Sequence, residues 1–431
     1  MNRSPAFATI QELSTGLRDG TLGALQLLEL YAQRIDRFGE LSKSFISLDL
    51  DRARDKARAI DRDFDASLAL NAIPYACKDL FDVAGLATTG GSKFLQDNIA
   101  QSDADTVRAM NTAGAICLGK TNLHEFAYGA TGENPFHGTP PNPYDHLRLA
   151  GGSSSGSAAA LGFGLCAAAL GTDTGGSVRA PAALCGLVGF KPTFGRVSCE
   201  GVIPFSWSLD HVGTLTRSAR DAATVFRALL PAAAGAVEAD LQRLRVGIPN
   251  SFFFERCDAE ILDSMEAMMN FLRAGGASLV EVDMPSMQYS RTVALTLQMP
   301  EALSYHSTHL AERAALYDNP GKLLVDFGMV NTAETDLTTT SATFNATLSC
   351  TQALFDVYAY WGTSDGGEVE NAWGNTNYVG SYTNVASANL GFYADGLSAD
   401  TQYHYTFTVQ NAATSVWARP SLGFWTVGAP T

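Results

Sequence analysis

Two short blocks of small and hydroxyl-bearing residues carry the clearest chemical signal in this sequence. Residues 151–157 read GGSSSGS, residues 171–177 read GTDTGGS, and a small apolar segment separates the two blocks. Lys78 stands upstream in the run YACKD. A serine hydroxyl is a weak nucleophile until a base activates it, and a buried neutral lysine can be that base where no histidine is evident. These residue types therefore indicate acyl transfer through a serine nucleophile.

The second block also supplies backbone donors. Glycine permits backbone conformations that other residues avoid, so the N–H groups of Thr174, Gly175, Gly176 and Ser177 can converge on one point. Such a cluster suits an oxyanion hole for the tetrahedral intermediate of acyl transfer. Ser177 is accordingly the expected nucleophile, and residues 178–183 are expected to lead into a helix.

Lys78 must be neutral before it can accept a proton. Deprotonating a lysine at pH 7 costs roughly 4–5 kcal/mol from its reference pKa, and burial lowers the pKa of a lysine by up to ~3–5 units. The apolar run at 72–76 is compatible with burial, whereas Asp79 would oppose the shift if it faced the same way. Taken alone, Lys78 also fits a solvated surface lysine.

Together these motifs resemble the amidase signature family, whose members hydrolyse or transfer amide bonds. The resemblance runs from about Leu13 to about Asp318. Further stretches follow in the family's order: GKTNLHEF at 119–126, TGENP at 131–135, NP at 142–143, GLVGFKPT at 186–193 and SLDHVG at 208–213. The resemblance implies a layered α/β fold with a mixed β-sheet between helices.

The family works through a Ser–cis-Ser–Lys triad, and the resemblance assigns its members here. Ser177 matches the nucleophile, Ser153 the relay serine with a cis peptide bond, and Lys78 the terminal base. Ser154 and Ser155 are expected to give hydrogen-bonding support. No cofactor or metal ion is implied.

The resemblance also suggests where a small-molecule amide substrate binds. Phe126, Ala127 and Tyr128 align with residues that approach the substrate in relatives. Arg179 is expected to bind a substrate carboxylate through its forked guanidinium, with a structural ion pair as the alternative. The pattern looks closest to bacterial amidases and to the A subunit of amidotransferases, and it leaves a homodimer or a partner subunit open.

Length and composition set broad limits on the protein. A chain of 431 residues is too long for one ordinary core, so two domains are expected. Its net charge of −15 argues against nonspecific binding to nucleic acid or to an anionic membrane. The seven cysteines show no metal-ligand spacing, and no apolar segment follows the N-terminus. These features favour a reducing, cytoplasmic location.

Periodicity places helices and strands along the first part of the chain. Residues 10–38 repeat apolar side chains at a helical period, and the Ala-rich run at 158–170 suits a buried helix. Short apolar runs that alternate with helical stretches indicate an α/β core. These runs lie at 72–76, 115–118, 167–170, 187–190, 245–249 and 278–282.

The composition changes near Phe327, and no lysine follows Val330. Segments that alternate at period two then appear at 341–348, 356–361 and 403–409, which predicts a β-sandwich. The stretch GLSADTQY at 396–403 resembles the tyrosine corner of fibronectin type III modules, in which the Tyr403 hydroxyl would bond the backbone upstream. The expected domains are therefore 1–328, amidase-like, and 329–431, fibronectin type III-like.

The join between these domains departs from the family pattern. Amidase signature proteins continue past the equivalent of Asp318 with elements that complete the sheet and part of the substrate pocket. A β-module follows directly here, so the amidase part is expected to lack that segment and to leave apolar surface uncovered.

Other readings compete with amide hydrolysis. Residues 114–121 satisfy the phosphate-loop pattern GxxxxGK[ST], with 323–326 as a candidate Walker B strand. Residues 152–156 satisfy GxSxG, which would make Ser154 the nucleophile, with His211 or His306 as its base. Further alternatives are a catalytically inactive fusion or scaffold protein and the subunit of a glutamine-dependent amidotransferase.

Overall fold

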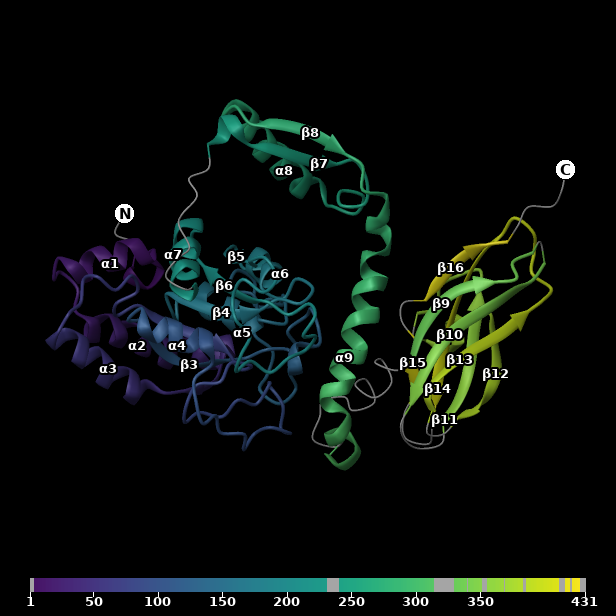
Figure 1. The fold of residues 1–431 in the computed structure, drawn as a ribbon, viewed down its shortest axis with the longest axis horizontal. Helices are drawn as coiled ribbons and strands as arrows, with labels where there is room; N and C mark the ends of the chain where they lie inside the picture. The colour runs from purple at the N-terminus through teal and green to yellow at the C-terminus, as the bar shows by residue number, and fades with distance from the viewer. Residues whose placement is uncertain are drawn as a thin grey trace. The chain divides into compact units, whose positions relative to one another are not determined.

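A six-stranded mixed sheet forms the centre of the N-terminal part of the chain (Figure 1). Its strand order is β1-β3-β2-β4-β6-β5. Strands β3, β2 and β4 run parallel, whereas β1, β6 and β5 join antiparallel to their neighbours. The strands are β1 (Phe45–Leu48), β2 (Pro74–Lys78), β3 (Ile116–Thr121), β4 (Ala168–Thr172), β5 (Val188–Phe190) and β6 (Val212–Thr216).

The computed structural model describes most of the chain. The described residues are 4–230, 240–313, 329–338, 340–350, 355–367, 369–382, 385–410, 415–418 and 421–426.

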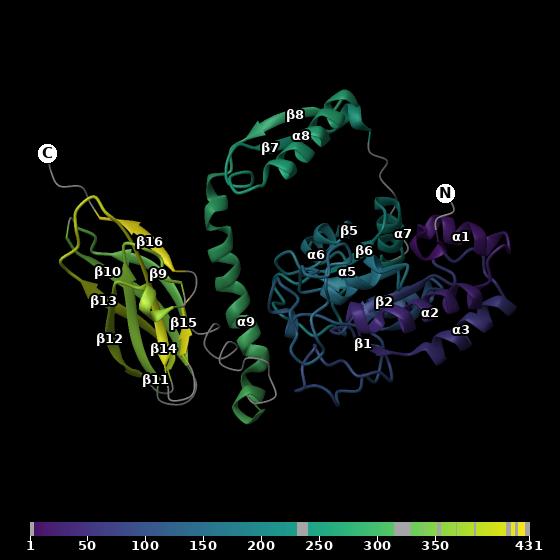
Figure 2. The ribbon, with the colours of Figure 1, turned by 180° about the vertical axis from the view of Figure 1, so that it is seen from behind.

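Helices cover this sheet on both faces, since every position of β2, β4 and β6 is buried. Helices α2 and α3 lie side by side (Figure 1, Figure 2), joined by an ion pair between Arg54 and Glu29 at 2.7 Å. The helices are α1 (Ile10–Arg18), α2 (Ala24–Ser42), α3 (Leu50–Arg62), α4 (Asp105–Thr112), α5 (Ser155–Gly162), α6 (Arg179–Leu184) and α7 (Ala219–Leu229). Short 3-10 turns lie at Pro5–Phe7 and Glu125–Ala127.

The structure confirms the α/β fold with its mixed sheet, and each predicted apolar run contributes to a strand. Two predicted helices were wrong in extent. The periodic segment at 10–38 forms two helices, because the chain turns after Arg18 and Gly20 adopts a left-handed conformation (φ 74°). The run at 158–170 leaves the helix after Gly162 and turns at Gly164 (φ 70°) before it enters β4.

A smaller unit comprises residues 232–297, of which the structure describes 240 onward. Strands β7 (Arg245–Pro249) and β8 (Ser278–Val282) pair in parallel, and α8 (Ala259–Ala274) connects them. Short 3-10 turns lie at Leu241–Arg243 and Pro285–Tyr289. None of the 16 residues of α8 is buried, and Phe271 is 66% exposed. This unit therefore presents apolar side chains to solvent.

Helix α9 (Ser290–Arg313) follows, and from Gln298 onward it belongs with the larger unit. Described residues of this helix contact the N-terminal part, Glu301 and His306 among them. The Glu301 carboxylate accepts hydrogen bonds from the hydroxyl groups of Ser206 and Ser208, and the His306 ring lies 4.4 Å from the Phe126 ring.

Two antiparallel sheets form the C-terminal module. One has the order β13-β10-β9, and the other has β12-β11-β14-β15 with β16 also paired to β14. The strands are β9 (Met329–Thr335), β10 (Ala342–Cys350), β11 (Phe355–Gly362), β12 (Asn375–Tyr382), β13 (Val385–Ala394), β14 (Gln402–Gln410), β15 (Ser415–Trp417) and β16 (Leu422–Trp425). A 3-10 turn lies at Glu370–Ala372.

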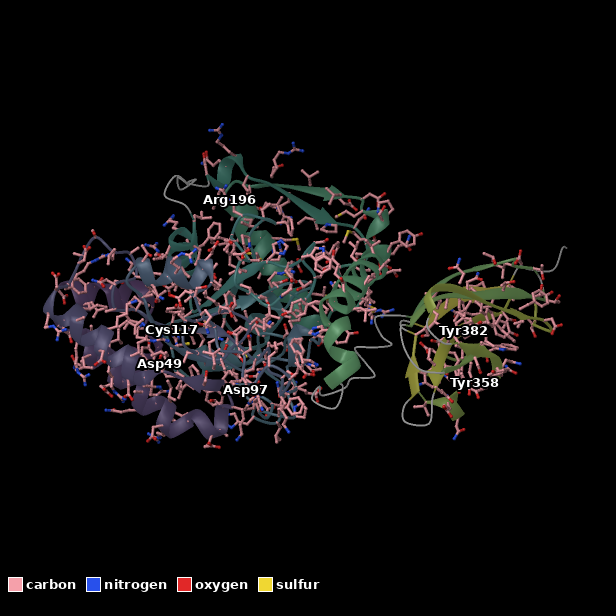
Figure 3. All side chains as sticks on the ribbon, turned by 60° about the horizontal axis from the view of Figure 1, so that its bottom comes forward. Asp49, Asp97, Cys117, Arg196, Tyr358 and Tyr382 are labelled. Carbon is pink, nitrogen blue, oxygen red and sulfur yellow. The ribbon has the colours of Figure 1, made fainter. Side chains whose placement is uncertain are left out.

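The two sheets share one apolar core, as expected of a sandwich. The Phe344 ring on β10 stacks on the Tyr405 ring on β14, with centroids 4.6 Å apart. Tyr382 packs against this core, and Tyr358 packs against a separate aromatic cluster. Figure 3 labels both tyrosines in the C-terminal module. The predicted tyrosine-corner bond is present, because the Ser398 N–H donates to the Tyr403 hydroxyl at 3.0 Å. The predicted boundary at Gly328 lies outside the described residues.

Candidate active site

Lys78 ends strand β2 and is completely buried. Its ammonium nitrogen donates to Ser153 Oγ at 2.6 Å and to Thr172 Oγ1 at 2.8 Å. Strands β2 and β4 are parallel neighbours, so their carboxyl ends bring Lys78 and Thr172 together at one edge of the sheet. Ser153 reaches the same point from the loop that precedes α5. Sequence positions 78, 153 and 172 thus meet in one polar cluster.

Burial lowers the pKa of Lys78 from 10.5 to about 7, although the charges of Asp210 and Asp173 act in the opposite direction. The charged form loses its hydration in this apolar setting, whereas the neutral amine loses much less. A substantial fraction of the Lys78 side chain is therefore neutral near pH 7 and available to accept a proton.

The serine block adopts the backbone that the family resemblance implied. The peptide bond between Gly152 and Ser153 is cis. Ser154 Oγ donates to the Thr172 carbonyl at 3.3 Å, and Ser155 Oγ donates to the Gly132 carbonyl at 3.3 Å. Both hydroxyl groups therefore hold the backbone around Ser153, which is the kind of contact expected of supporting residues.

Ser177 lies beside this block. The Ser154 N–H donates to the Ser177 carbonyl at 3.2 Å, which holds the two glycine-rich segments against each other. Gly176, immediately before it, has φ of 127°, a conformation that favours glycine. Ser177 is partly exposed, and within the described part of the chain its hydroxyl has no hydrogen-bond partner.

Asp173 shapes the loop that carries Ser177. Its carboxylate is buried and accepts from the Gly176 N–H at 2.8 Å and the Val178 N–H at 3.1 Å. The Arg179 guanidinium binds the same carboxylate through Nε at 3.0 Å and Nη2 at 2.9 Å. Burial acts to raise the pKa of Asp173, but the Arg179 guanidinium and the N–H groups of Val178 and Arg179 lower it overall.

This arrangement bears on two predicted roles. The Gly176 N–H already serves Asp173, so the donors that remain for an oxyanion in this loop are the N–H groups of Thr174, Gly175 and Ser177. Arg179 forms the structural ion pair that the sequence left as an alternative to carboxylate binding. Its side chain remains 51% exposed.

Asp210 fastens the neighbouring loop to Thr174. Its carboxylate accepts from Thr174 Oγ1 at 2.5 Å and from the N–H groups of Phe205 and Ser206 at 2.8 and 2.9 Å. Burial raises the pKa of this carboxyl against the effect of those donors. Thr172, Asp173 and Asp210 all lie in motifs that the sequence singled out, yet none had an assigned role.

The predicted substrate residues 126–128 occupy a short 3-10 turn at Glu125–Ala127 and the residue after it. Phe126 and Ala127 are buried and have positive φ values of 49° and 63°. Tyr128 is partly buried, and its ring lies 5.5 Å from the Phe205 ring. Tyr128 is therefore the member of this trio with side-chain surface left for a ligand.

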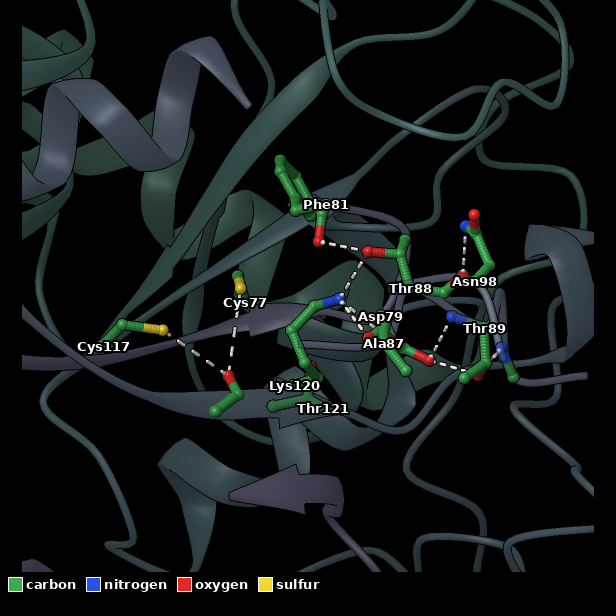
Figure 4. Close-up of polar contacts among 12 residues, drawn as sticks. Cys77, Asp79, Phe81, Ala87, Thr88, Thr89, Asn98, Cys117, Lys120 and Thr121 are labelled. Atoms are coloured by element: carbon green, nitrogen blue, oxygen red, sulfur yellow. Dashed lines mark hydrogen bonds and ion pairs between the residues drawn. The ribbon is translucent and has the colours of Figure 1, made fainter. Parts of the chain in front are cut away.

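The phosphate-loop reading of residues 114–121 is wrong. Most of the pattern forms the largely buried strand β3, and Lys120 is completely buried. The Lys120 ammonium binds the Asp79 carboxylate at 2.7 Å and also donates to the Ala87 carbonyl and Thr88 Oγ1, each at 3.1 Å (Figure 4). The candidate Walker B run at 323–326 lies outside the described residues.

The Asp79 carboxylate binds Lys120 rather than Lys78. Its second oxygen accepts a hydrogen bond from the Thr89 N–H at 3.0 Å (Figure 4). The negative charge that follows Lys78 in sequence is therefore compensated by Lys120. The GxSxG reading also fits poorly, because Ser154 is completely buried and its hydroxyl is committed to a backbone carbonyl.

Removing the Lys120 charge is expected to be costly. In a Lys120→Met variant the free energy of unfolding should fall by about 3–5 kcal/mol, because the Asp79 carboxylate is left buried and unpaired. That carboxylate would also favour protonated Lys78, so activity should shift to higher pH. Urea denaturation measures the first effect and a pH–rate profile the second.

The matched control is Asp55→Ala, which removes the exposed ion pair between Asp55 and Arg58. Exposed pairs contribute less than about 1 kcal/mol. Equal destabilisation by the two substitutions would contradict a structural role for the buried pair.

Other classes of site receive no support from the described residues. None of their His, Cys, Asp and Glu side chains gather into a group of three that suits a metal ion. No helix within those residues has the length and apolar character needed to cross a membrane.

Comparison with known proteins gives extensive matches. Residues 26–349 match the family model described as Amidase. The A subunit of the glutamyl-tRNA(Gln) amidotransferase from Coxiella burnetii (strain Dugway 5J108-111) is 39% identical over 312 residues, which covers 69% of this chain and 65% of that relative. This chain therefore spans less than two thirds of that relative's length.

Solved structures agree with the sequence matches. A crystal structure of an amidase is 37% identical with a TM-score of 0.67, covering 72% of this chain and 71% of that one. The native peptide amidase of Stenotrophomonas maltophilia is 32% identical with a TM-score of 0.64, covering 72% of this chain and 70% of that one. The chain belongs to the amidase family.

Proposed function

We propose that the protein hydrolyses linear amides through a serine acyl-enzyme. Ser177 is the nucleophile, Ser153 the proton relay and Lys78 the terminal base. The observation that carries this proposal is the 2.6 Å hydrogen bond between Lys78 Nζ and Ser153 Oγ, made by a fully buried amine. The proximity of Ser177 to the same serine block supports it.

The first half of the reaction forms the acyl-enzyme. Ser177 Oγ attacks the amide carbonyl carbon while its proton passes to Ser153 Oγ, and the Ser153 proton passes to Lys78 Nζ. The N–H groups of Thr174, Gly175 and Ser177 stabilise the negative charge on the carbonyl oxygen. The C–N bond then breaks, and Lys78 returns a proton through Ser153 to the departing amine.

Water completes the cycle. It attacks the Ser177 ester, gives its proton to Lys78 through Ser153, and releases the carboxylic acid as the Ser177 hydroxyl is restored. Tyr128 and the exposed part of Arg179 are proposed to contact the substrate, with the buried residues Phe126 and Ala127 positioning Tyr128.

Two rival functions can be distinguished from amide hydrolysis by experiment. The curated relative is named as part of an amidotransferase, which favours glutamine as the amide donor and a partner subunit. An inactive fusion or scaffold would release no ammonia from any amide. Ammonia release by the full chain should be measured from glutamine and from simple aliphatic and aromatic amides. Turnover of simple amides without glutamine turnover supports the hydrolase, and no turnover at all contradicts it.

We also propose that the chain divides into domains at 1–328 and 329–431, the second a fibronectin type III-like module. The separate sandwich core and the bond between Ser398 and Tyr403 support this division. A fragment of residues 329–431 should melt in one cooperative transition at the temperature it shows in the full chain. A non-cooperative melt, followed by circular dichroism, would argue against an independent domain.

A further inference from the structure

A cavity of about 390 Å³ adjoins the proposed triad. Two of its lining residues connect it to the reaction site. Thr172 Oγ1 accepts a hydrogen bond from Lys78 Nζ at 2.8 Å, and the Asp210 carboxylate accepts one from Thr174 Oγ1 at 2.5 Å. Two residues of the cavity wall are thus hydrogen-bonded, one to the base and the other to the loop that carries Ser177.

Most of the cavity wall is apolar. One segment, residues 194–207, contributes most of it, and Leu80 closes the wall from the loop after β2. Two aromatic side chains of this segment are unusually exposed for their size, Phe194 at 56% and Trp207 at 53%. Exposed aromatic surface around a concave site commonly marks a place where a ligand binds.

The charge on the wall restricts the ligand. Its charged side chains are the carboxylates Glu200 and Asp210, and none of the described residues that line it is Lys, Arg or His. A substrate carboxylate would meet two negative groups and no cation. Arg179 follows Ser177 by two residues, but its guanidinium is bound to Asp173 and does not line the cavity.

The wall is held in place by contacts outside the cavity. Glu301 of α9 accepts from Ser206 Oγ at 2.6 Å and from the Ser208 N–H at 3.1 Å, on either side of Trp207. The Tyr128 ring packs against the Phe205 ring from another direction. A wall fixed in this way loses little conformational freedom when a ligand binds.

We propose that this cavity binds an uncharged apolar substituent of the amide substrate, a single aromatic ring or a branched alkyl group. The proposal rests on the hydrolase function above, because it assigns the substituent to that substrate. Ligand pockets span roughly 300–1,000 Å³, so a volume of about 390 Å³ suits one ring rather than a long acyl chain. Carboxylate-bearing amides, glutamine among them, are disfavoured.

Binding can be measured without turnover in the full chain carrying Ser177→Ala. Isothermal titration with phenylacetamide is expected to give at least tenfold tighter binding than titration with succinamate. Adding Trp207→Ala should weaken phenylacetamide binding by about tenfold through lost apolar contact, and Trp207→Phe should restore most of it. Tyr144→Ala, which removes a 78% exposed aromatic side chain outside the cavity, should change nothing.

Three outcomes would overturn the assignment: equal or tighter binding of succinamate, no effect of Trp207→Ala, or no binding of either amide. Labelling of Ser177 in the unmodified full chain by a fluorophosphonate probe separates this test from the proposed function. Labelling together with a preference for succinamate would leave the hydrolase standing and reject the cavity assignment. Apolar binding without labelling would reject the hydrolase and leave the cavity as an apolar binding site that holds no substrate.

Discussion

Replacing Ser177 by alanine is expected to lower kcat by about a million-fold, to the level of background hydrolysis. The variant lacks the hydroxyl that forms the acyl-enzyme, and no other described hydroxyl of the site is both accessible and free of partners. Because the triad acts as one proton-transfer unit, Lys78→Ala should be almost as damaging, and the double variant should be no worse. Steady-state ammonia release measures all three.

Ser154→Ala is the matched control, since Ser154 is a neighbouring serine whose hydroxyl binds a backbone carbonyl. It should retain most of the activity. Ser153→Ala should be severe, with some activity left if water replaces the relay. Unchanged turnover in the Ser177→Ala variant would exclude Ser177 as the nucleophile. Complete loss of turnover in Ser154→Ala alone would favour Ser154 as the nucleophile of the GxSxG motif.

Lys78→Met is expected to abolish turnover and yet stabilise the protein in mild acid. Burial holds the pKa of Lys78 at about 7 in the folded chain, below its ordinary value of 10.5. Below pH 7 the folded chain must therefore bury a charge, at a cost of about 5 kcal/mol. This cost shrinks as pH rises from 7 and disappears above 10.5.

The substitution also removes two hydrogen bonds, to Ser153 and Thr172, which contribute about 1–2 kcal/mol together. The net change in the free energy of unfolding should be a gain of about 3 kcal/mol at pH 6 and a loss near pH 10. Denaturant titrations at both pH values test this reversal of sign. A loss of stability at pH 6 would show that the folded chain does not bury a charged Lys78 at this energetic cost.

The lowered pKa of Lys78 also predicts the pH dependence of the unmodified enzyme. Activity should rise about tenfold per pH unit up to about pH 7 and then level off, because only neutral Lys78 accepts the proton. A profile that stays flat between pH 5 and 8 would argue against a lysine base.

The sequence predicted most of the sheet because buried strands appear as short apolar runs. Strands β1 and β6 were missed for a physical reason. β1 (FISL) is an antiparallel edge strand of only four residues, none of them buried, and β6 (VGTLT) has hydroxyl and glycine positions that are buried only because helices cover both faces of the sheet. The pairing of β1 and the burial of β6 depend on tertiary neighbours that periodicity does not report.

In the candidate site, too, some roles could be predicted from the sequence and others could not. The residue types at 78, 153 and 177 carry the chemistry, so sequence alone places them in roles. The functions of Asp173 and Thr172 depend on distances, because Asp173 binds Arg179 and the N–H groups of the loop, whereas the Thr172 hydroxyl accepts a hydrogen bond from Lys78. The pairing of Asp79 with Lys120, 41 residues apart, likewise required the parallel register of β2 and β3.

The most direct test of the proposed mechanism is the site of covalent labelling by a fluorophosphonate probe. The full chain should be incubated with the probe, digested and mapped by mass spectrometry, with Ser177→Ala and Lys78→Met as parallel samples. The mechanism predicts one labelled residue, Ser177, and strongly reduced labelling in Lys78→Met at pH 8. Labelling of Ser154, or no labelling of a well-folded chain, would contradict it.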